Sequence, residues 1–184
     1  MNGWIFIDKP KNITSFKVIK RLKKVLNIKK IGHTGTLDPF ATGILAIALG
    51  EATKSIHYLN QNKVYKFNVV FGELKDTDDI TGKTIKKSNI LPTLAAIDQC
   101  IKKFIGKHRQ IPPQFSAVKV NGKRAYKLAR NNQKFELKAK DVFIKSIECL
   151  GAKNENEYSF IMECSTGTYV RSIARDLGKM LGTY

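Results

Sequence analysis

The sequence has few acidic residues and no long apolar run. Aspartate and glutamate number 15 against 33 lysines and arginines, which leaves a formal charge of +18 over 184 residues. Such an excess is typical of nucleic-acid-binding proteins, although basic ribosomal and membrane-surface proteins share it. No stretch approaches the ~20 apolar residues of a membrane span, and the N-terminus lacks the basic and apolar regions of a signal peptide. We therefore expect a cytoplasmic protein that does not bind membranes.

Cysteines are also scarce. Cys100, Cys149 and Cys164 are odd in number, widely spaced and set in apolar runs, so neither a disulfide framework nor a zinc site is indicated. Repeats, linkers and low-complexity segments are absent, and a hydrophobic content of 42% favours a packed domain over a disordered basic tail. We expect one domain over residues 1–184 with reduced core thiols.

The stretch from Gly32 to Gly43 is the most distinctive part of the chain. Its glycines and proline predict an irregular loop, because glycine permits positive φ and proline fixes its own φ. Asp38 directly precedes Pro39, whose ring pushes the preceding residue toward extended backbone. The loop therefore presents a single carboxylate on a stiff segment, although Asp-Pro is also a common turn dipeptide.

Hydrophobic periodicity predicts alternating helices and strands around this loop. We expect strands over 4–7, 44–49, 65–71, 142–150 and 158–164, and helices after Thr14, over 51–60, from Pro92 to Gly106 and from Ser165 to Gly182. The lysines and arginine of the first helix form either a solvated face or a phosphate-binding face. Tyr65 opens the apolar row of its strand, which suits either a core residue or a side chain at the rim of the sheet.

Two further segments carry unusual charge. The acidic turn of Asp76 to Asp79 lacks the spacing of a calcium loop, so we do not interpret it as a metal site. Residues 107–140 contain two prolines followed by dense cations, which predicts a basic surface insertion. Arg171 lies in the first turn of the last helix, where the helix dipole gives a cation little stabilisation, so an acid elsewhere in the chain is a candidate partner.

The run Gly32-His33-Thr34-Gly35-Thr36-Leu37-Asp38-Pro39, continuing through Ala41-Thr42-Gly43, closely resembles the catalytic motif of the TruB family of tRNA pseudouridine synthases. The segments around Lys9-Pro10, Pro112-Pro113 and Gly167 to Ile173 are similar to other motifs of that family. The resemblance implies that the first of these supports the active-site loop and that the second leads into a mobile loop that grips the RNA. The resemblance implies an α+β fold with a mixed, mainly antiparallel central sheet and flanking helices. It makes Asp38 the essential catalytic residue and Arg171 its ion-pair partner. It also places Tyr65 and Tyr169 at the target base and puts His33 in the position that the flipped base vacates.

This resemblance implies isomerisation of uridine 55 in the T arm of tRNA, without cofactor or metal, by a monomeric enzyme. Tyr65 is also a candidate for the chemistry itself. The expected RNA-binding cations are Lys9, Lys119, Lys123, Arg124 and Arg130. Because the family pattern continues beyond Leu181-Gly182, the resemblance also implies that the C-terminal part of the catalytic domain and a small RNA-binding PUA domain are absent.

Three alternatives remain from the residues alone. A non-catalytic RNA-binding protein or tRNA chaperone explains the charge but leaves the central loop unexplained. A phosphate-binding enzyme is disfavoured because the glycines match neither the dinucleotide-binding nor the Walker pattern. A glycosidase ordinarily uses a second carboxylate across the scissile bond, and none is suggested near Asp38.

Overall fold

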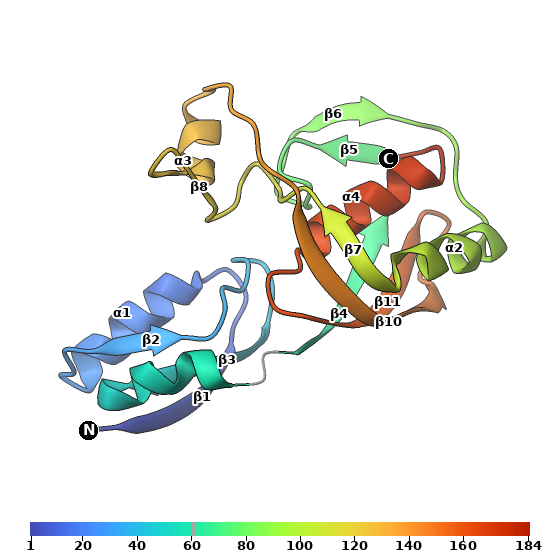
Figure 1. Ribbon diagram of the computed structural model, residues 1–184. Coiled ribbons are helices and arrows are strands. Elements are labelled where there is room, and N and C mark those ends of the chain that lie inside the picture. The colour runs from blue at the N-terminus through green and yellow to red at the C-terminus, as the bar shows by residue number, and fades with distance from the viewer. Residues whose placement is uncertain (60–61) are drawn as a thin grey trace. The chain divides into compact units, whose positions relative to one another are not determined.

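The computed structural model describes residues 1–59 and 62–184 (Figure 1). Contacts divide the chain into two compact units, Met1–Gln61 and Asn62–Tyr184, whereas the sequence analysis expects one domain. Among the described residues, no helix is both long enough and apolar enough to cross a bilayer.

The first unit is a small antiparallel sheet covered by a helix (Figure 1, blue to teal). Strands β1 (Gly3–Lys9), β2 (Ile31–His33) and β3 (Gly43–Leu49) pair in the order β1-β3-β2, with β3 central. Helix α1 (Ser15–Val25) begins as predicted at Thr14, whose side chain accepts a hydrogen bond of 3.1 Å from the Lys17 amide. The core joins Val18 of α1 to Leu45, Ile47 and Leu49 of β3. The cations of α1 remain on its exposed side.

The helix predicted over 51–60 is a 3-10 helix, η1 (Gly50–Tyr58), and the last residue of the predicted range lies outside the described residues. The hydroxyls of Thr53 and Ser55 donate to the carbonyls three residues before them, each at 2.8 Å. Such bonds compete with the backbone pattern of an α-helix. None of the η1 residues is buried, so no apolar stripe stabilises an α-helix here.

The second unit is built on a four-stranded antiparallel sheet. Its strands, in the order β4-β11-β10-β7, are β4 (Lys63–Val70), β11 (Glu157–Cys164), β10 (Lys140–Ala152) and β7 (Gly106–Gln110). The strand predicted over 158–164 is β11, and its residues Tyr158, Phe160, Met162 and Cys164 are buried on one face. Helices α2 (Leu94–Ile101) and α4 (Val170–Met180) join this core through Ile97, Ile101, Ile173 and Leu177. The mainly antiparallel α+β architecture is confirmed, with the antiparallel strands divided between the sheets of the two units.

Helix α2 begins later than predicted. Thr93 caps it by accepting a hydrogen bond of 3.2 Å from the Ala96 amide, so Pro92 lies before the cap rather than inside the first turn. Leu94 at the start of the helix is 47% exposed, while Ile97, Ile101 and Phe104 are buried. Phe104 belongs to a short 3-10 extension, η2 (Lys102–Phe104).

Three smaller features complete the second unit. Strands β5 (Glu73–Lys75) and β6 (Thr84–Lys87) form a hairpin that carries the acidic turn. Strands β8 (Lys119–Val120) and β9 (Lys123–Arg124) form a second hairpin that leads into helix α3 (Ala125–Arg130).

Strand β7 is a departure from the predicted basic insertion of residues 107–140. Residues 107–110 pair with β10 at the edge of the main sheet, from Arg109 opposite Asp141 to Lys107 opposite Phe143. Residue 140 already belongs to β10. The basic segment therefore starts at Ile111, contains β8, β9 and α3, and ends before β10.

Candidate active site

The Asp38 loop connects β2 to β3 and is fixed at several points within the first unit. The Thr34 amide donates to the Ala46 carbonyl at 3.1 Å, and the Ala41 amide closes a turn on the Asp38 carbonyl at 3.1 Å. Gly43 is the first residue of β3, and its φ of +135° is a backbone conformation that other residues rarely adopt.

Backbone contacts hold the residues on either side of Asp38. The Ser15 hydroxyl accepts from the Leu37 amide at 3.0 Å and lies 3.2 Å from the Leu37 carbonyl. The Asn12 amide donates to the Pro39 carbonyl at 2.8 Å. Asp38 is thus a half-buried carboxylate between two anchored neighbours.

Lys9 stabilises this loop through hydrogen bonds from the protein interior and is not a surface cation. Its side chain is fully buried, and Nζ donates to the carbonyls of Pro10, Ile13 and Pro39 at 2.9, 2.9 and 3.2 Å. Burial lowers the pKa of the Lys9 ammonium from its ordinary value, and the negative charge of Asp38 opposes that shift. The prediction that Lys9 binds RNA is therefore wrong, because its three N–H donors are committed to the backbone.

His33 ends β2 beside the same loop. Its Nδ1 lies 2.6 Å from the Gly35 carbonyl oxygen. Because a carbonyl can only accept, Nδ1 carries the proton in this contact. The half-buried ring is therefore oriented by its own loop.

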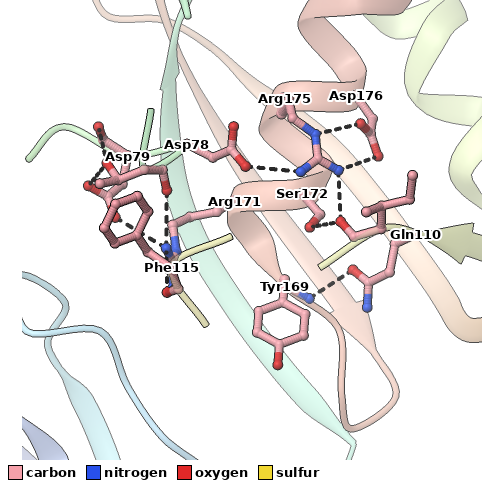
Figure 2. A network of polar contacts seen from close by, with 11 residues as sticks. Asp78, Asp79, Gln110, Phe115, Tyr169, Arg171, Ser172, Arg175 and Asp176 are labelled. Carbon is pink, nitrogen blue, oxygen red and sulfur yellow. Dashed lines mark hydrogen bonds and ion pairs between the residues drawn. The ribbon is translucent and has the colours of Figure 1, made fainter. Parts of the chain in front are cut away.

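In the second unit, Tyr65 and Tyr169 lie on elements next to the core. Tyr65 is opposite Met162 in the β4–β11 pair and packs half-buried against the core, which confirms its place on the apolar face. Tyr169 is the N-cap residue of α4, and Figure 2 shows its ring directed away from the polar network beside it.

Gln110 fixes the backbone around Tyr169, a role that the sequence analysis does not predict. The fully buried Gln110 side chain accepts from the Tyr169 amide at 3.0 Å and donates to the Gly167 carbonyl at 2.7 Å. The last residue of β7 thereby positions the start of α4 (Figure 2). Its place in the Gln-Ile-Pro-Pro run is the only signal in the sequence, and it does not identify a partner 59 residues away.

Arg171 binds the acidic turn. Its Nη1 lies 3.5 Å from Asp79 Oδ2 and donates to the Thr77 carbonyl at 3.1 Å, while both Nη atoms contact the Phe115 carbonyl at 3.3 Å (Figure 2). The side chains of Arg171 and Asp79 are only 10% and 9% exposed. The expectation that Arg171 pairs with a distant acid is confirmed by Asp79. The pairing with Asp38 that the resemblance implies stays a prediction.

The cations Lys119, Lys123, Arg124 and Arg130 are all exposed, as an RNA-binding role requires. Lys119, Lys123 and Arg124 line a concavity of ≈ 350 Å³ together with Lys127. Arg130 stacks instead over the Tyr126 ring, 5.6 Å from its centroid.

Comparison with known proteins gives a family match. A family model described as "TruB family pseudouridylate synthase (N terminal domain)" matches residues 23–170, more than half of the chain. The tRNA pseudouridine synthase B of Ehrlichia ruminantium is 52% identical over 186 residues, covering 100% of this chain and 63% of that protein. The protein of the same name from Brucella anthropi is 44% identical, covering 100% of this chain and 57% of that protein. The chain therefore spans less than two thirds of the length of these relatives.

Two solved structures resemble the chain. One is a Cbf5–Nop10–Gar1 complex, in which the matching chain has a TM-score of 0.66 and 29% identity over 98% of this chain and 44% of that one. The other is an H/ACA RNP bound to a substrate RNA containing 2'-deoxyuridine, with a TM-score of 0.63 and 26% identity over 98% of this chain and 43% of that one.

Proposed function

We propose that this chain converts a uridine of tRNA to pseudouridine, because it belongs to the TruB family of pseudouridylate synthases. The observation that carries the proposal is the anchoring of Asp38 between Leu37 and Pro39, whose backbones are held by Ser15, Asn12 and Lys9. The finer features of the proposal are uridine 55 in the T arm as the target, a monomeric enzyme and a cytoplasmic location.

The reaction requires one carboxylate and involves no net hydrolysis. The C1'–N1 bond breaks, the uracil turns and C5 joins C1'; the proton on C5 leaves and N1 takes up a proton, so the change is an isomerisation. We assign Asp38 as the group that either attacks as a nucleophile or stabilises positive charge at C1'. The Lys9 ammonium and the Asp38 carboxylate attract each other, because the charge of Asp38 opposes the lowering of the Lys9 pKa.

Arg171 is proposed to orient the Asp38 carboxylate during the reaction. A guanidinium presents several N–H donors in a fixed plane, so it can bind more than one acceptor at once. The contacts of Arg171 with Asp79, Thr77 and Phe115 support this role, because they hold the guanidinium in one orientation.

The target base must leave its stack, which costs a few kcal/mol. We assign Tyr65 and Tyr169 as the aromatic surface that receives the flipped base, and His33 as the side chain that fills the vacated position. The hydrogen bond from His33 to Gly35 supports this assignment, because it pre-orients the ring.

The charge distribution supports tRNA as the substrate. The concavity of Lys119, Lys123, Arg124 and Lys127 offers cations to a phosphate backbone, and the exposed side of α1 offers further lysines. Phosphate contacts of this kind give affinity without sequence specificity.

The assay that tests the function is tritium release from tRNA labelled at C5 of uridine. A synthase replaces the C5–H bond by the C5–C1' bond, so we expect about one tritium per tRNA to enter water when a single site reacts. A non-catalytic RNA-binding protein or tRNA chaperone would bind the same tRNA and release none.

Binding should be strongly salt-dependent, because neutralised phosphates release counterions. We expect Lys123→Gln with Arg124→Gln to reduce the slope of log K against log salt by about two, at roughly one per lost contact. Fluorescence anisotropy with labelled tRNA measures the slope. The control is Lys102→Gln with Lys103→Gln, which removes the same charge from exposed positions of η2. Equal slopes for the two double variants would show that the basic segment does not bind phosphates.

We expect Tyr65→Phe to remove most turnover while fold and tRNA affinity stay nearly unchanged. Phenylalanine keeps the ring in its half-buried place beside Met162, so the substitution removes only the hydroxyl. Single-turnover kinetics measures the turnover, thermal melting measures the stability of the fold, and anisotropy with labelled tRNA measures the affinity. The control is Tyr158→Phe, which removes a buried hydroxyl that bonds the Pro92 carbonyl and should alter stability instead of turnover. Near-normal product formation by Tyr65→Phe would make Tyr65 a core residue only.

A further inference from the structure

Two arginines of α4 each tie the acidic turn to the segment that follows β7. Arg171 joins Asp79 to the Phe115 carbonyl, and Arg175, one helical turn later, joins Asp78 to the Ile111 carbonyl (Figure 2). The proposed chemistry uses Arg171 and gives no role to Arg175 or Asp78.

The contacts of Arg175 with Asp78 and Ile111 are shorter than those of Arg171 with Asp79, Thr77 and Phe115. Its Nη1 donates to Asp78 Oδ2 at 2.9 Å, and its Nη2 donates to the Ile111 carbonyl at 2.8 Å. Asp176 receives two further bonds, from Nε at 2.9 Å and from Nη2 at 3.3 Å. The side chains of Arg175 and Asp78 are only 12% and 11% exposed, so water screens their ion pair poorly.

The two residues that Arg175 connects, Asp78 and Ile111, each fix the backbone of the residues that follow them. Asp78 has φ of +56°, a conformation that residues other than glycine seldom adopt, and it directly precedes Asp79, the partner of Arg171. Ile111 directly precedes the buried Pro112 and Pro113, whose rings stiffen the start of the basic segment. The Ser172 hydroxyl also donates to the Ile111 carbonyl at 2.8 Å.

We infer that Asp78 and Arg175 are a positioning pair for the proposed synthase reaction. The pair holds the turn of Asp76 to Asp79 and the segment from Ile111 to Phe115 so that Arg171 keeps one orientation. The inference rests on the proposed function for its kinetic consequence. It does not make either residue catalytic, because both act through Arg171.

The kinetic test is a double-mutant cycle between Arg175 and Arg171. We expect Arg175→Gln to lower the single-turnover rate about tenfold, with tRNA affinity changed less than about threefold. In an Arg171→Ala background the same substitution should lower the rate by less than about threefold, because residues acting as one unit are not additive. Asp78→Asn should reproduce the loss, and it provides a second variant if Arg175→Gln does not fold. The control is Arg109→Gln, which removes an exposed arginine from β7.

Hydrogen exchange provides a readout that needs no activity. In Arg175→Gln the amides of residues 76–82, 111 and 114–116 should exchange about tenfold faster, while those of β10 and β11 keep their protection. If the wild-type chain releases no tritium, the proposed function fails, and the exchange result alone decides whether the pair holds the two segments. If the wild type is active and Arg175→Gln leaves either its rate or the exchange of these amides unchanged, the inference is overturned and the function stands.

Discussion

Asp38→Asn is expected to abolish pseudouridine formation while tRNA binding is preserved. Asparagine has nearly the size of aspartate and keeps the turn that Ala41 closes on residue 38, but it cannot supply a carboxylate. We expect the single-turnover rate to fall by roughly 10⁴-fold or more, as when an essential catalytic group is removed. Tritium release measures the rate, and anisotropy with labelled tRNA measures the affinity.

The control for this substitution is Asp8→Asn, which removes an exposed carboxylate from β1 of the same unit. It should leave turnover unchanged. If Arg171 acts through Asp38, Arg171→Ala alone should also be strongly impaired, and adding it to Asp38→Asn should cost little more. Turnover of Asp38→Asn within a few-fold of normal would eliminate Asp38 as the catalytic group.

Elements with a strong apolar period were predictable from the sequence. Tyr158, Phe160, Met162 and Cys164 recur at every second position, and they form one buried face of β11. The stripe of α4 behaves likewise, with Ile173 and Leu177 fully buried. In these segments the period of the side chains alone decides which face enters the core.

Strand β7 could not be predicted in the same way. Its residues, Gly-Lys-His-Arg-Gln, carry no apolar alternation, and they become a strand because β10 offers a backbone edge to pair with. Strand preference depends strongly on the neighbouring strand, so a segment with little preference of its own can pair at an edge. Tertiary context therefore overrides the local pattern that suggested a surface insertion.

In the site, too, local backbone structure was predictable from the sequence, whereas contacts between residues far apart in the chain were not. The Asp38 loop was predictable because its glycines and proline act on neighbouring backbone. Apart from Asp176, the partners described for Arg171 and Arg175 lie 56 to 97 residues away, and no spacing rule selects Asp79 for one and Asp78 for the other. Lys9 was misassigned because a lysine next to a proline resembles a surface cation until its three carbonyl partners are known.

Burial of Lys9 leads to the largest expected effect on stability. Lys9→Met fills a similar volume but removes the ammonium from the carbonyls of Pro10, Ile13 and Pro39. Pro39 keeps its bond from the Asn12 amide, whereas the carbonyls of Pro10 and Ile13 lose a charged donor in a partly buried place. We expect the first unit to lose about 2–4 kcal/mol of unfolding free energy, the range for stranding buried hydrogen-bonding groups.

Urea titration followed by Trp4 fluorescence measures this loss, because Trp4 lies in β1 and is the single tryptophan of the chain. The matched control is Lys11→Met, which makes the same substitution at an exposed lysine two residues later and should leave the midpoint unchanged. A loosened Asp38 loop should also lower turnover in Lys9→Met, while tRNA affinity stays near normal because Lys9 does not reach the surface. Coincident urea titrations for Lys9→Met and wild type would contradict the stabilising role of buried Lys9. A loss of tRNA affinity without a loss of stability would show that Lys9 binds RNA.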